Sequence, residues 1–169
     1  RDTQHRIRGP RMEELKADLK LIDAELPKGT CEVELVDSDL FHWEVALTGP
    51  MGSPYKGGTF RFQIWFPTDY PTKPPRLKCL TPVYHCNIDA KGTVCLDLED
   101  DLLRLKPSHE TEELSSTRIS ALCLVQALLS LFAAPVPEDG LVAEASQLYI
   151  CDRQEYNRRA HEWTMKHAF

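Results

Sequence analysis

The sequence lacks the features that would direct it to a membrane, to the secretory pathway or to nucleic acid. No apolar run in its 169 residues approaches the roughly 20 residues that span a bilayer, and the first residues show no signal-peptide pattern. Lys and Arg number 20 against 26 Asp and Glu, for a net charge of −6, whereas nucleic-acid binders usually present a basic surface. We therefore expect a cytoplasmic or nuclear protein with neither membrane nor nucleic acid among its partners.

Signatures of disulfide and metal frameworks are also missing. The chain has six cysteines but no CxxC pair, and a chain of this length without a secretory signal favours reduced thiols over a disulfide framework. A zinc site would need more ligands at conventional spacing than His85, Cys86 and Cys95 provide. No metal site is predicted.

The first half of the chain contains one helical pattern and four strand-like runs. A polar, basic lead-in over residues 1–10 is expected to be flexible. Apolar residues from Met12 to Leu26 then recur at spacings of three and four, which predicts an amphipathic helix that stops at Pro27. Four runs of strand composition follow, separated by turn residues: residues 31–36, 41–47, 59–66 and 76–80.

Helical periodicity returns in the last third of the chain. A strongly apolar helix is expected from about Ser120 to the prolines that begin at Pro135. Two further helices are expected over residues 141–150 and from Arg153 to the end. No repeat, low-complexity tract or second-domain linker interrupts residues 11–169. We predict one α+β domain with a helix, a four-stranded antiparallel meander and three further helices.

Between Leu80 and Ser120 the regular pattern disappears, and so long an irregular stretch in a compact domain is usually functional or mobile. Cys95 lies in this stretch, where catalytic residues concentrate on loops, although a reduced cysteine is most often a small buried hydrophobe. From position alone, burial is the favoured interpretation for Cys95. It is also favoured for four other cysteines, which lie in apolar segments or at helix edges: Cys31, Cys79, Cys123 and Cys151.

Three polar residues near this stretch have both a chemical and a structural interpretation. The Asn87 amide could donate hydrogen bonds to the negative charge that develops in acyl transfer, or could merely cap a turn. Asp139 could act at a site or cap a helix that begins at Leu141. Tyr84 could equally be a packing residue. Taken singly, the structural interpretation is favoured for Asn87.

Taken together, several segments resemble the ubiquitin-conjugating enzymes. Residues 84–88 stand where that family has its histidine-proline-asparagine motif, and residues 92–98 resemble its active-site stretch. Other matching segments occur in the right order: residues 41–43, 49–58, 66–75, 135–139 and 149–163. The resemblance covers about residues 11–169 and implies the family fold, which agrees with the pattern of elements above.

The resemblance also implies a mechanism. An activating enzyme would pass ubiquitin to Cys95 as a thioester, and a substrate lysine would then attack it, usually with a ligase of the RING type holding the parts together. Asn87 would stabilise the oxyanion or order the active-site loop, while Tyr84 and Asp139 would border the lysine. The cleft would also include Asp97, His85 and Cys86. No cofactor is implied, since the activating enzyme consumes the ATP.

The chain departs from the family pattern in three places. Cys86 replaces the motif proline, which predicts a less rigid loop and a second thiol near the site. An acidic insertion at about residues 99–118 is either a solvated loop or an element that shields Cys95 or selects lysines. The third departure is on the surface expected to meet activating enzyme and ligase: Glu13, Glu14, Thr72, Thr117 and Arg118.

Two alternatives to a ubiquitin carrier remain open. The run over residues 78–81 and the insertion resemble a conjugating enzyme for another modifier of the NEDD8 type, whereas the tail over residues 156–164 looks more like the ubiquitin group. A catalytically inactive binding module on the same fold would explain the lost proline and the altered ligase surface. Such modules typically lack the cysteine that stands here at position 95.

Overall fold

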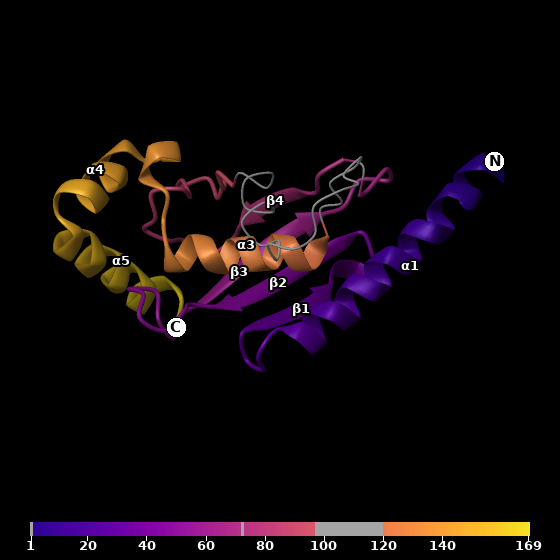
Figure 1. Cartoon of the computed structure of the whole chain (residues 1–169), viewed down its shortest axis with the longest axis horizontal. Helices are drawn as coiled ribbons and strands as arrows, with labels where there is room; N and C mark the ends of the chain where they lie inside the picture. Colours follow the sequence, from indigo (N-terminus) through magenta and orange to yellow (C-terminus); the bar gives the residue numbers. More distant parts are fainter. Residues whose placement is uncertain (1, 72, 97–119) are drawn as a thin grey trace, which may run out of the picture.

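The computed structural model describes residues 2–71, 73–96 and 120–169. Four residues predicted in the cleft or the partner surface, and the acidic insertion at about 99–118, therefore lie outside the described residues: Thr72, Asp97, Thr117 and Arg118. Figure 1 shows the order of elements along the chain: α1 (Asp2–Glu25), β1 (Cys31–Leu35), η1 (Val36–Ser38), β2 (His42–Thr48), β3 (Thr59–Trp65), β4 (Arg76–Cys79), α3 (Ala121–Ala133), η2 (Pro137–Asp139), α4 (Ala143–Cys151) and α5 (Arg153–His167). The predicted class and element order are confirmed.

The four strands form one antiparallel sheet in the order β1-β2-β3-β4. Along β2, buried and half-buried residues alternate, with Trp43, Val45 and Leu47 at most 1% exposed. Because side chains of a strand point alternately to the two faces, this alternation gives the sheet one buried face. The register continues the buried face across the sheet, since Val45 pairs with Phe62 and Phe62 with Cys79.

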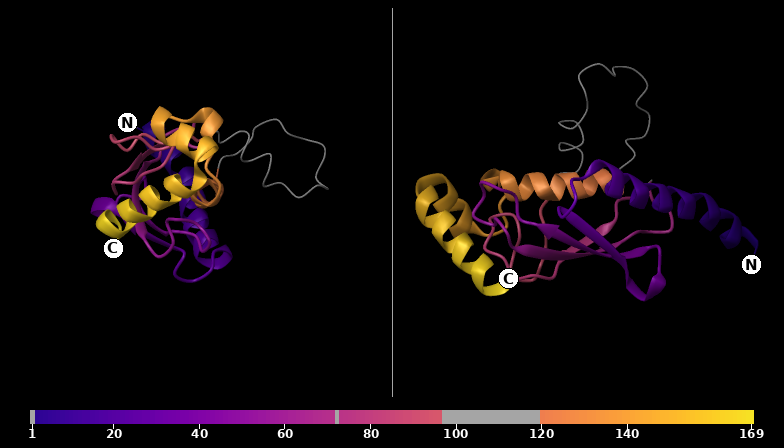
Figure 2. Two further views of the ribbon diagram at one scale, coloured as in Figure 1. Left: turned by 90° about the vertical axis from the view of Figure 1, so that its left-hand side faces the viewer. Right: turned by 90° about the horizontal axis from the view of Figure 1, so that it is seen from below.

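Helix α3 covers the buried face of the sheet (Figures 1 and 2). The Ser120 hydroxyl caps its start by accepting the Cys123 N–H at 3.2 Å. At its other end the Phe132 ring packs against the Phe60 ring, with 4.7 Å between centroids. Helix α1 joins this layer through buried Asp18, whose carboxylate accepts the N–H of Ala121, the first residue of α3, at 3.3 Å and the Tyr70 hydroxyl at 2.8 Å. The apolar helix predicted near Ser120 is thus the central helix of the core.

Helices α4 and α5 lie at the end of the sheet away from the N-terminal end of α1 (Figure 2). The chain ends beside the start of β3, where the Thr59 N–H donates to the Ala168 carbonyl at 2.9 Å. The last two helices therefore close one end of the domain, next to the irregular segment that follows β4.

Among the described residues, no helix is both long and apolar enough to cross a bilayer.

The N-terminal residues differ from the prediction. A flexible lead-in was expected over residues 1–10, whereas α1 begins at Asp2 and includes Gly9 and Pro10. The helix continues through both residues, although glycine has a low helix propensity and proline removes one N–H from the helical ladder and crowds the carbonyl four residues earlier. The pattern from Met12 onward marked the apolar stripe of the helix, which is shorter than the helix itself.

Candidate active site

His85 is a buried anchor of the irregular segment after β4. Its imidazole is 1% exposed, and Nδ1 accepts the Asn87 N–H at 3.0 Å. Because Nδ1 acts as the acceptor, Nε2 carries the hydrogen and donates to the Leu131 carbonyl at 2.9 Å. Burial lowers the pKa of His85 to about 4, so the ring is neutral at physiological pH. His85 was expected in the active-site cleft, and the structure places its ring in the core against α3.

The Asn87 carboxamide ties this segment to the loop that contains η2. Nδ2 donates to the carbonyls of Val136 at 2.7 Å and Asp139 at 3.3 Å, while Oδ1 accepts the Val136 N–H at 2.9 Å. The side chain is completely buried. Both amide hydrogens are directed at backbone carbonyls, so this geometry fits the loop-ordering role of Asn87 rather than donation to an oxyanion.

Cys95 follows a turn that is docked onto β4. Gly92 in this turn has φ +84°, and its carbonyl accepts the Cys79 N–H at 2.9 Å. A Cβ at Gly92 would lie 2.1 Å from the Cys79 carbonyl oxygen, so only glycine fits here. Asp89 Oδ1 accepts the N–H groups of Lys91 and Thr93, both at 2.9 Å. These contacts fix the backbone conformation of the turn that precedes Cys95.

The Cys95 backbone is held against Asn87, whereas its side chain is half-buried. Its N–H donates to the Asn87 carbonyl at 2.9 Å, and the preceding residue, Val94, forms a bridge with Ile88. All six cysteines are reduced. Burial raises the pKa of Cys79 to about 12 and that of Cys31 to about 11, so both thiols stay protonated at neutral pH and are poor nucleophiles.

Cys86 occupies the position of the motif proline, and its thiol points into the core. The residue is 0% exposed, and its Sγ–H donates to Asn87 Oδ1 at 3.3 Å. Its carbonyl accepts the N–H groups of Leu141 at 2.8 Å and Val142 at 3.2 Å, just before α4. Burial raises the pKa of this thiol. Cys86 was expected in the active-site cleft; the structure places its side chain in the core, and hydrogen bonds through its carbonyl and thiol hold the segment where the family has a proline.

Tyr84 belongs to a cluster of tyrosines between the segment and α5. Its hydroxyl oxygen is buried, and its ring centroid lies 5.6 Å from that of Tyr156. The Tyr84 carbonyl accepts the Tyr55 hydroxyl at 2.7 Å, and the Tyr55 and Tyr156 hydroxyls are also 2.7 Å apart. Burial raises the pKa of Tyr84, and the charge of Arg159 partly offsets this rise. The hydroxyl predicted to border a lysine is thus buried.

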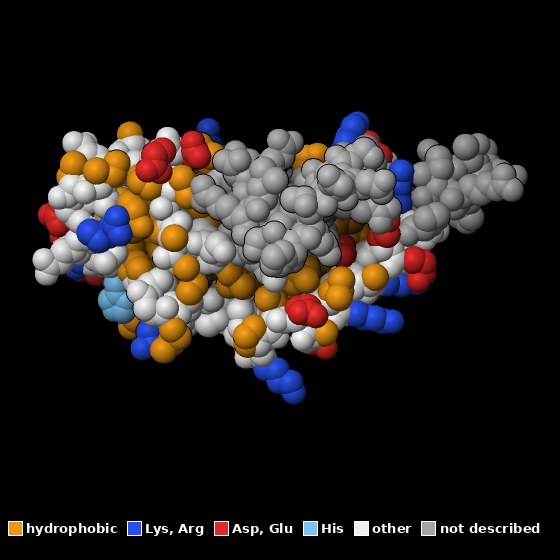
Figure 3. All heavy atoms as spheres, viewed as in Figure 1, with side chains coloured by type: hydrophobic (Ala, Val, Ile, Leu, Met, Phe, Trp, Pro, Cys, Tyr) orange, Lys and Arg blue, Asp and Glu red, His pale blue; other side chains and the backbone are white. Residues whose placement is uncertain are grey.

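Asp139 ends η2 with an exposed side chain. Its carbonyl is one of the two that Asn87 Nδ2 binds, so the carboxylate is carried by an anchored loop. It does not cap the next helix: α4 has Val142 at its N-cap position and no side-chain cap there. Figure 3 shows acidic side chains gathered at the edge of the molecule where η2 and α4 lie. The position leaves the carboxylate accessible to a cationic group from solvent.

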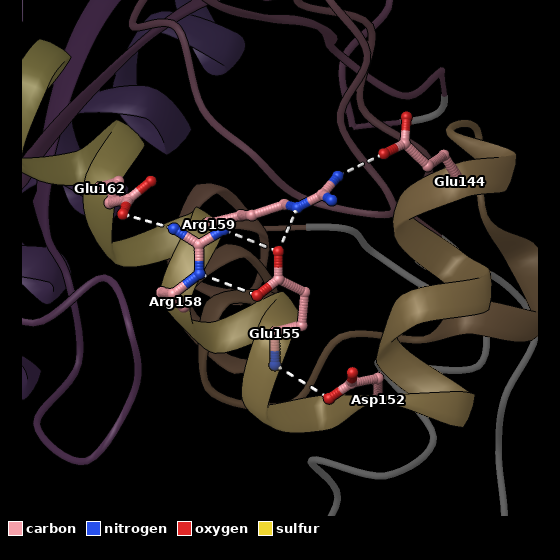
Figure 4. Close-up of polar contacts among 6 residues, drawn as sticks. All are labelled: Glu144, Asp152, Glu155, Arg158, Arg159 and Glu162. Atoms are coloured by element: carbon pink, nitrogen blue, oxygen red, sulfur yellow. Dashed lines mark hydrogen bonds and ion pairs between the residues drawn. The ribbon is translucent and has the colours of Figure 1, made fainter.

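A charged cluster that the sequence analysis missed joins α4 to α5 (Figure 4). Arg159 binds Glu155 through Nε at 2.8 Å and Glu144 of α4 through Nη1. Arg158 binds Glu155 at 2.7 Å and Glu162 at 2.6 Å. The spacing of three and four among the α5 residues was a visible signal of helical ion pairs, whereas Glu144 lies 15 positions from Arg159. The pairing of Tyr55 with Tyr156, 101 positions apart, left no such local signal.

The predicted partner surface is described only on α1. Glu13 is exposed and pairs with Lys16 at 3.0 Å. Glu14 is half-buried, and its charge contributes to raising the pKa of Asp18, which burial raises most. Within the described part of the chain, no group of three His, Cys, Asp or Glu side chains is arranged to hold a metal ion.

Comparisons with known proteins agree with this architecture. A family model described as ubiquitin-conjugating enzyme matches residues 13–164. Among solved structures, the chain is similar to the E2 domain of a ubiquitin-conjugating enzyme from Toxoplasma gondii, with 30% sequence identity and a TM-score of 0.74. That match covers 93% of this chain and 99% of the other. The matched range contains Cys95, Asn87 and the η2 loop.

Proposed function

Because the chain belongs to the ubiquitin-conjugating enzyme family, we propose that it accepts ubiquitin as a thioester on Cys95 and transfers it to lysines of substrate proteins. The observation that carries the proposal is the position of Cys95. Cys95 is half-buried, so part of the residue reaches solvent, while its N–H donates to the Asn87 carbonyl at 2.9 Å. A nucleophile on a fixed backbone, in a residue that is only partly buried, suits acyl transfer.

The proposed reaction has two acyl-transfer steps. The Cys95 thiolate attacks the thioester carbonyl that joins ubiquitin to the activating enzyme, and the cysteine of that enzyme leaves as a thiolate. A substrate lysine in its amine form then attacks the new thioester, an amide bond forms, and the Cys95 thiolate leaves. The proton lost by the amine passes to solvent. No cofactor is needed in either step, because the ATP is spent by the activating enzyme.

We assign the remaining residues supporting roles in this proposal. The exposed Asp139 carboxylate attracts and orients the lysine, which is the substrate-positioning effect that accelerates a reaction between two bound groups. Asn87 holds the loop that carries Asp139, through the bond from its Nδ2 to the Asp139 carbonyl. A ligase, expected to be of the RING type, brings the substrate. A cytoplasmic or nuclear location accompanies this role.

A thioester assay tests the proposal directly. The protein is incubated with ATP, ubiquitin and the ubiquitin-activating enzyme, and the products are separated on a non-reducing gel. We expect a band that disappears on adding a thiol reductant, is lost in Cys95→Ala and is kept in Cys151→Ser. Cys151 is the matched control because it is the cysteine with an exposed side chain. A reductant-sensitive band that survives in Cys95→Ala would contradict the assignment of the site.

The same assay separates the two alternatives. A band with a NEDD8-type modifier and its activating enzyme, but none with ubiquitin, would identify a conjugating enzyme for another modifier. No band with any modifier would favour a binding module without catalysis. The burial of Cys86 bears on this second alternative, because hydrogen bonds to Leu141, Val142 and Asn87 hold the segment without the motif proline.

A further inference from the structure

A groove lies between the segment that follows β4 and the last turns of α5. Its volume is about 680 Å³, within the roughly 300–1,000 Å³ typical of small-molecule sites. The walls are mainly apolar and include Val83, Ile88, Val142 and Trp163. Cys95 is not among the lining residues, so the groove is separate from the reacting sulfur.

The walls of the groove are held in place before any ligand arrives. One wall is the turn that contains Gly92, which is bonded to Cys79 through its carbonyl. The opposite wall is α5, whose C-terminal end is fixed to β3 by the bond from the Thr59 N–H to the Ala168 carbonyl. A preformed cavity binds without the entropic cost of ordering its walls.

Trp163 leaves a large apolar surface exposed in this groove. Its indole is 43% exposed and contacts the His167 ring at a tilt, with 4.9 Å between ring centroids and 39° between ring planes. Aromatic side chains with one face packed and the other open are common anchors in binding sites. An apolar or aromatic group placed against Trp163 would remove from water both the exposed surface of the indole and its own apolar surface.

The rim of the groove is positively charged, although the protein as a whole is acidic. Lys78 and Lys91 are exposed residues of the lining. Neither lysine takes part in an ion pair with any residue in the described ranges. The lining contains one acidic side chain, Asp89, whose Oδ1 already accepts two backbone N–H groups. An anion is therefore favoured over a cation at this rim.

We propose that this groove binds a small hydrophobic carboxylate, an aromatic or aliphatic acid. Its apolar body lies against Trp163 and Ile88, and its carboxylate meets Lys78 and Lys91. The positive rim favours an anionic ligand over a neutral or cationic one. The apolar walls favour a hydrophobic carboxylate over inorganic anions such as phosphate. This site is independent of thioester chemistry on Cys95, so it stands or falls separately from the proposed function.

Three probes of one shape and different charge test the proposal on the intact chain. They are 2-naphthoate, 2-naphthalenemethanol and 2-(aminomethyl)naphthalene, each titrated while amide and indole N–H signals are followed by NMR. We expect 2-naphthoate to shift the signals of Ile88, Lys91 and Val142 and the indole signal of Trp163. We expect it to bind about tenfold more tightly than the alcohol, with the amine weakest, because the rim attracts negative charge.

Matched lysine variants locate the charge effect. Lys91→Glu should weaken 2-naphthoate binding about tenfold and leave the alcohol little changed. Lys20→Glu makes the same change of charge on an exposed position of α1 and should have little effect on either probe. Trp163→Ala should weaken all three probes, because the apolar contact is lost.

Several results would overturn the proposal. They are equal affinity for the three probes, no shifts at saturating probe, shifts centred on α1 or α3, or an equal loss in Lys20→Glu and Lys91→Glu. Shifts at Trp163 that grow with protein concentration in the absence of probe would identify a second copy of the chain as the occupant. Shifts caused by an acidic peptide but by none of the small probes would identify a protein partner instead.

Discussion

Two polar regions of this domain contain hydrogen bonds and ion pairs of similar length, but their side chains differ in exposure to water. In the first, a buried junction, the segment after β4 is tied to the η2 loop through Asn87 and His85, which are 0% and 1% exposed. In the second, the charged cluster on α4 and α5, Arg158 and Arg159 have side chains 54% and 37% exposed. Both regions contain contacts between 2.6 and 3.0 Å.

The comparison teaches that contact distance alone does not measure stability. A hydrogen bond contributes about 1 kcal/mol net, but a buried group that loses its partner costs about 1–3 kcal/mol. The attraction in an exposed ion pair is screened by solvent, and forming the pair reduces the conformational entropy of both side chains, so its net contribution to stability is small. Although the guanidinium groups of Arg158 and Arg159 lower the pKa of Glu155 to about 2, that shift in an exposed cluster is no measure of folding energy. The buried junction should dominate.

Asn87→Ala should break the comparison most strongly. The substitution leaves the Val136 N–H and the carbonyls of Val136 and Asp139 without their partner. With several buried groups unsatisfied, we expect the free energy of unfolding to fall by about 4 kcal/mol. Urea titration monitored by circular dichroism measures this change.

The matched control is Asn157→Ala, at an exposed position of α5. It should change the free energy of unfolding by less than about 0.5 kcal/mol, as surface substitutions usually do. A loss below about 1 kcal/mol in Asn87→Ala would mean that the junction is not a stability element. Water or a rearranged loop would then have replaced the carboxamide.

The second prediction concerns pH and His85. The unfolded chain protonates this histidine near pH 6.5, whereas burial lowers the folded pKa to about 4. The unfolded state therefore binds the extra proton first, and stability is full above about pH 6.5 and falls as pH drops toward 4. The loss approaches about 3 kcal/mol by the linkage relation. Urea titrations at several pH values measure the slope.

Asp18 acts in the opposite direction at the acidic end. Burial raises its folded pKa above the usual value, so the folded state takes up this proton first and stability increases as pH falls through that range. The His85 effect is best isolated by comparing His85→Gln, which should lose the slope, with His161→Gln on the exposed side of α5. A slope that persists in His85→Gln would assign it to another group.

The fold was largely predictable because its signals are local. The β2 run was placed at residues 41–47 and lies at His42–Thr48, since alternation and flanking turn residues are read within one stretch. The start of α1 was misplaced because the apolar stripe begins at Met12, while the helix begins at Asp2. A helix that extends beyond the core has no apolar pattern to mark its end.

The sequence placed the candidate site residues in one region of the chain but did not predict how their side chains are arranged. The order of motifs brought Cys95 and Asn87 into one segment, and they are joined by a backbone hydrogen bond. The burial of His85 depends on the Leu131 carbonyl, 46 positions away, and the partner of Asn87 lies 49 positions away. Such contacts are made by irregular segments, which have no periodicity from which their neighbours can be inferred.

The tyrosine pair offers a sharper test inside the buried region. The Tyr55 hydroxyl has one hydrogen and donates it to the Tyr84 carbonyl, so Tyr156 is the donor to Tyr55. Tyr55→Phe leaves the Tyr84 carbonyl without its donor and should lower the free energy of unfolding by about 2 kcal/mol. Tyr156→Phe removes one donor and should lower it by about 1 kcal/mol. Thermal and urea unfolding measure both. Tyr149→Phe is the control, and a larger loss in Tyr156→Phe than in Tyr55→Phe would reverse the assigned donors.

The smallest effect is expected where the contacts are most numerous. Arg158→Gln removes the pairs with Glu155 and Glu162, yet both partners then regain water, so we expect the melting temperature to change by no more than about 2 °C. Adding about 1 M NaCl, where the Debye length is about 3 Å, should remove even that difference between variant and parent. A loss that matches Asn87→Ala, or one that salt leaves unchanged, would show that the cluster is shielded from water. The distinction between the buried junction and the charged cluster would then have to be abandoned.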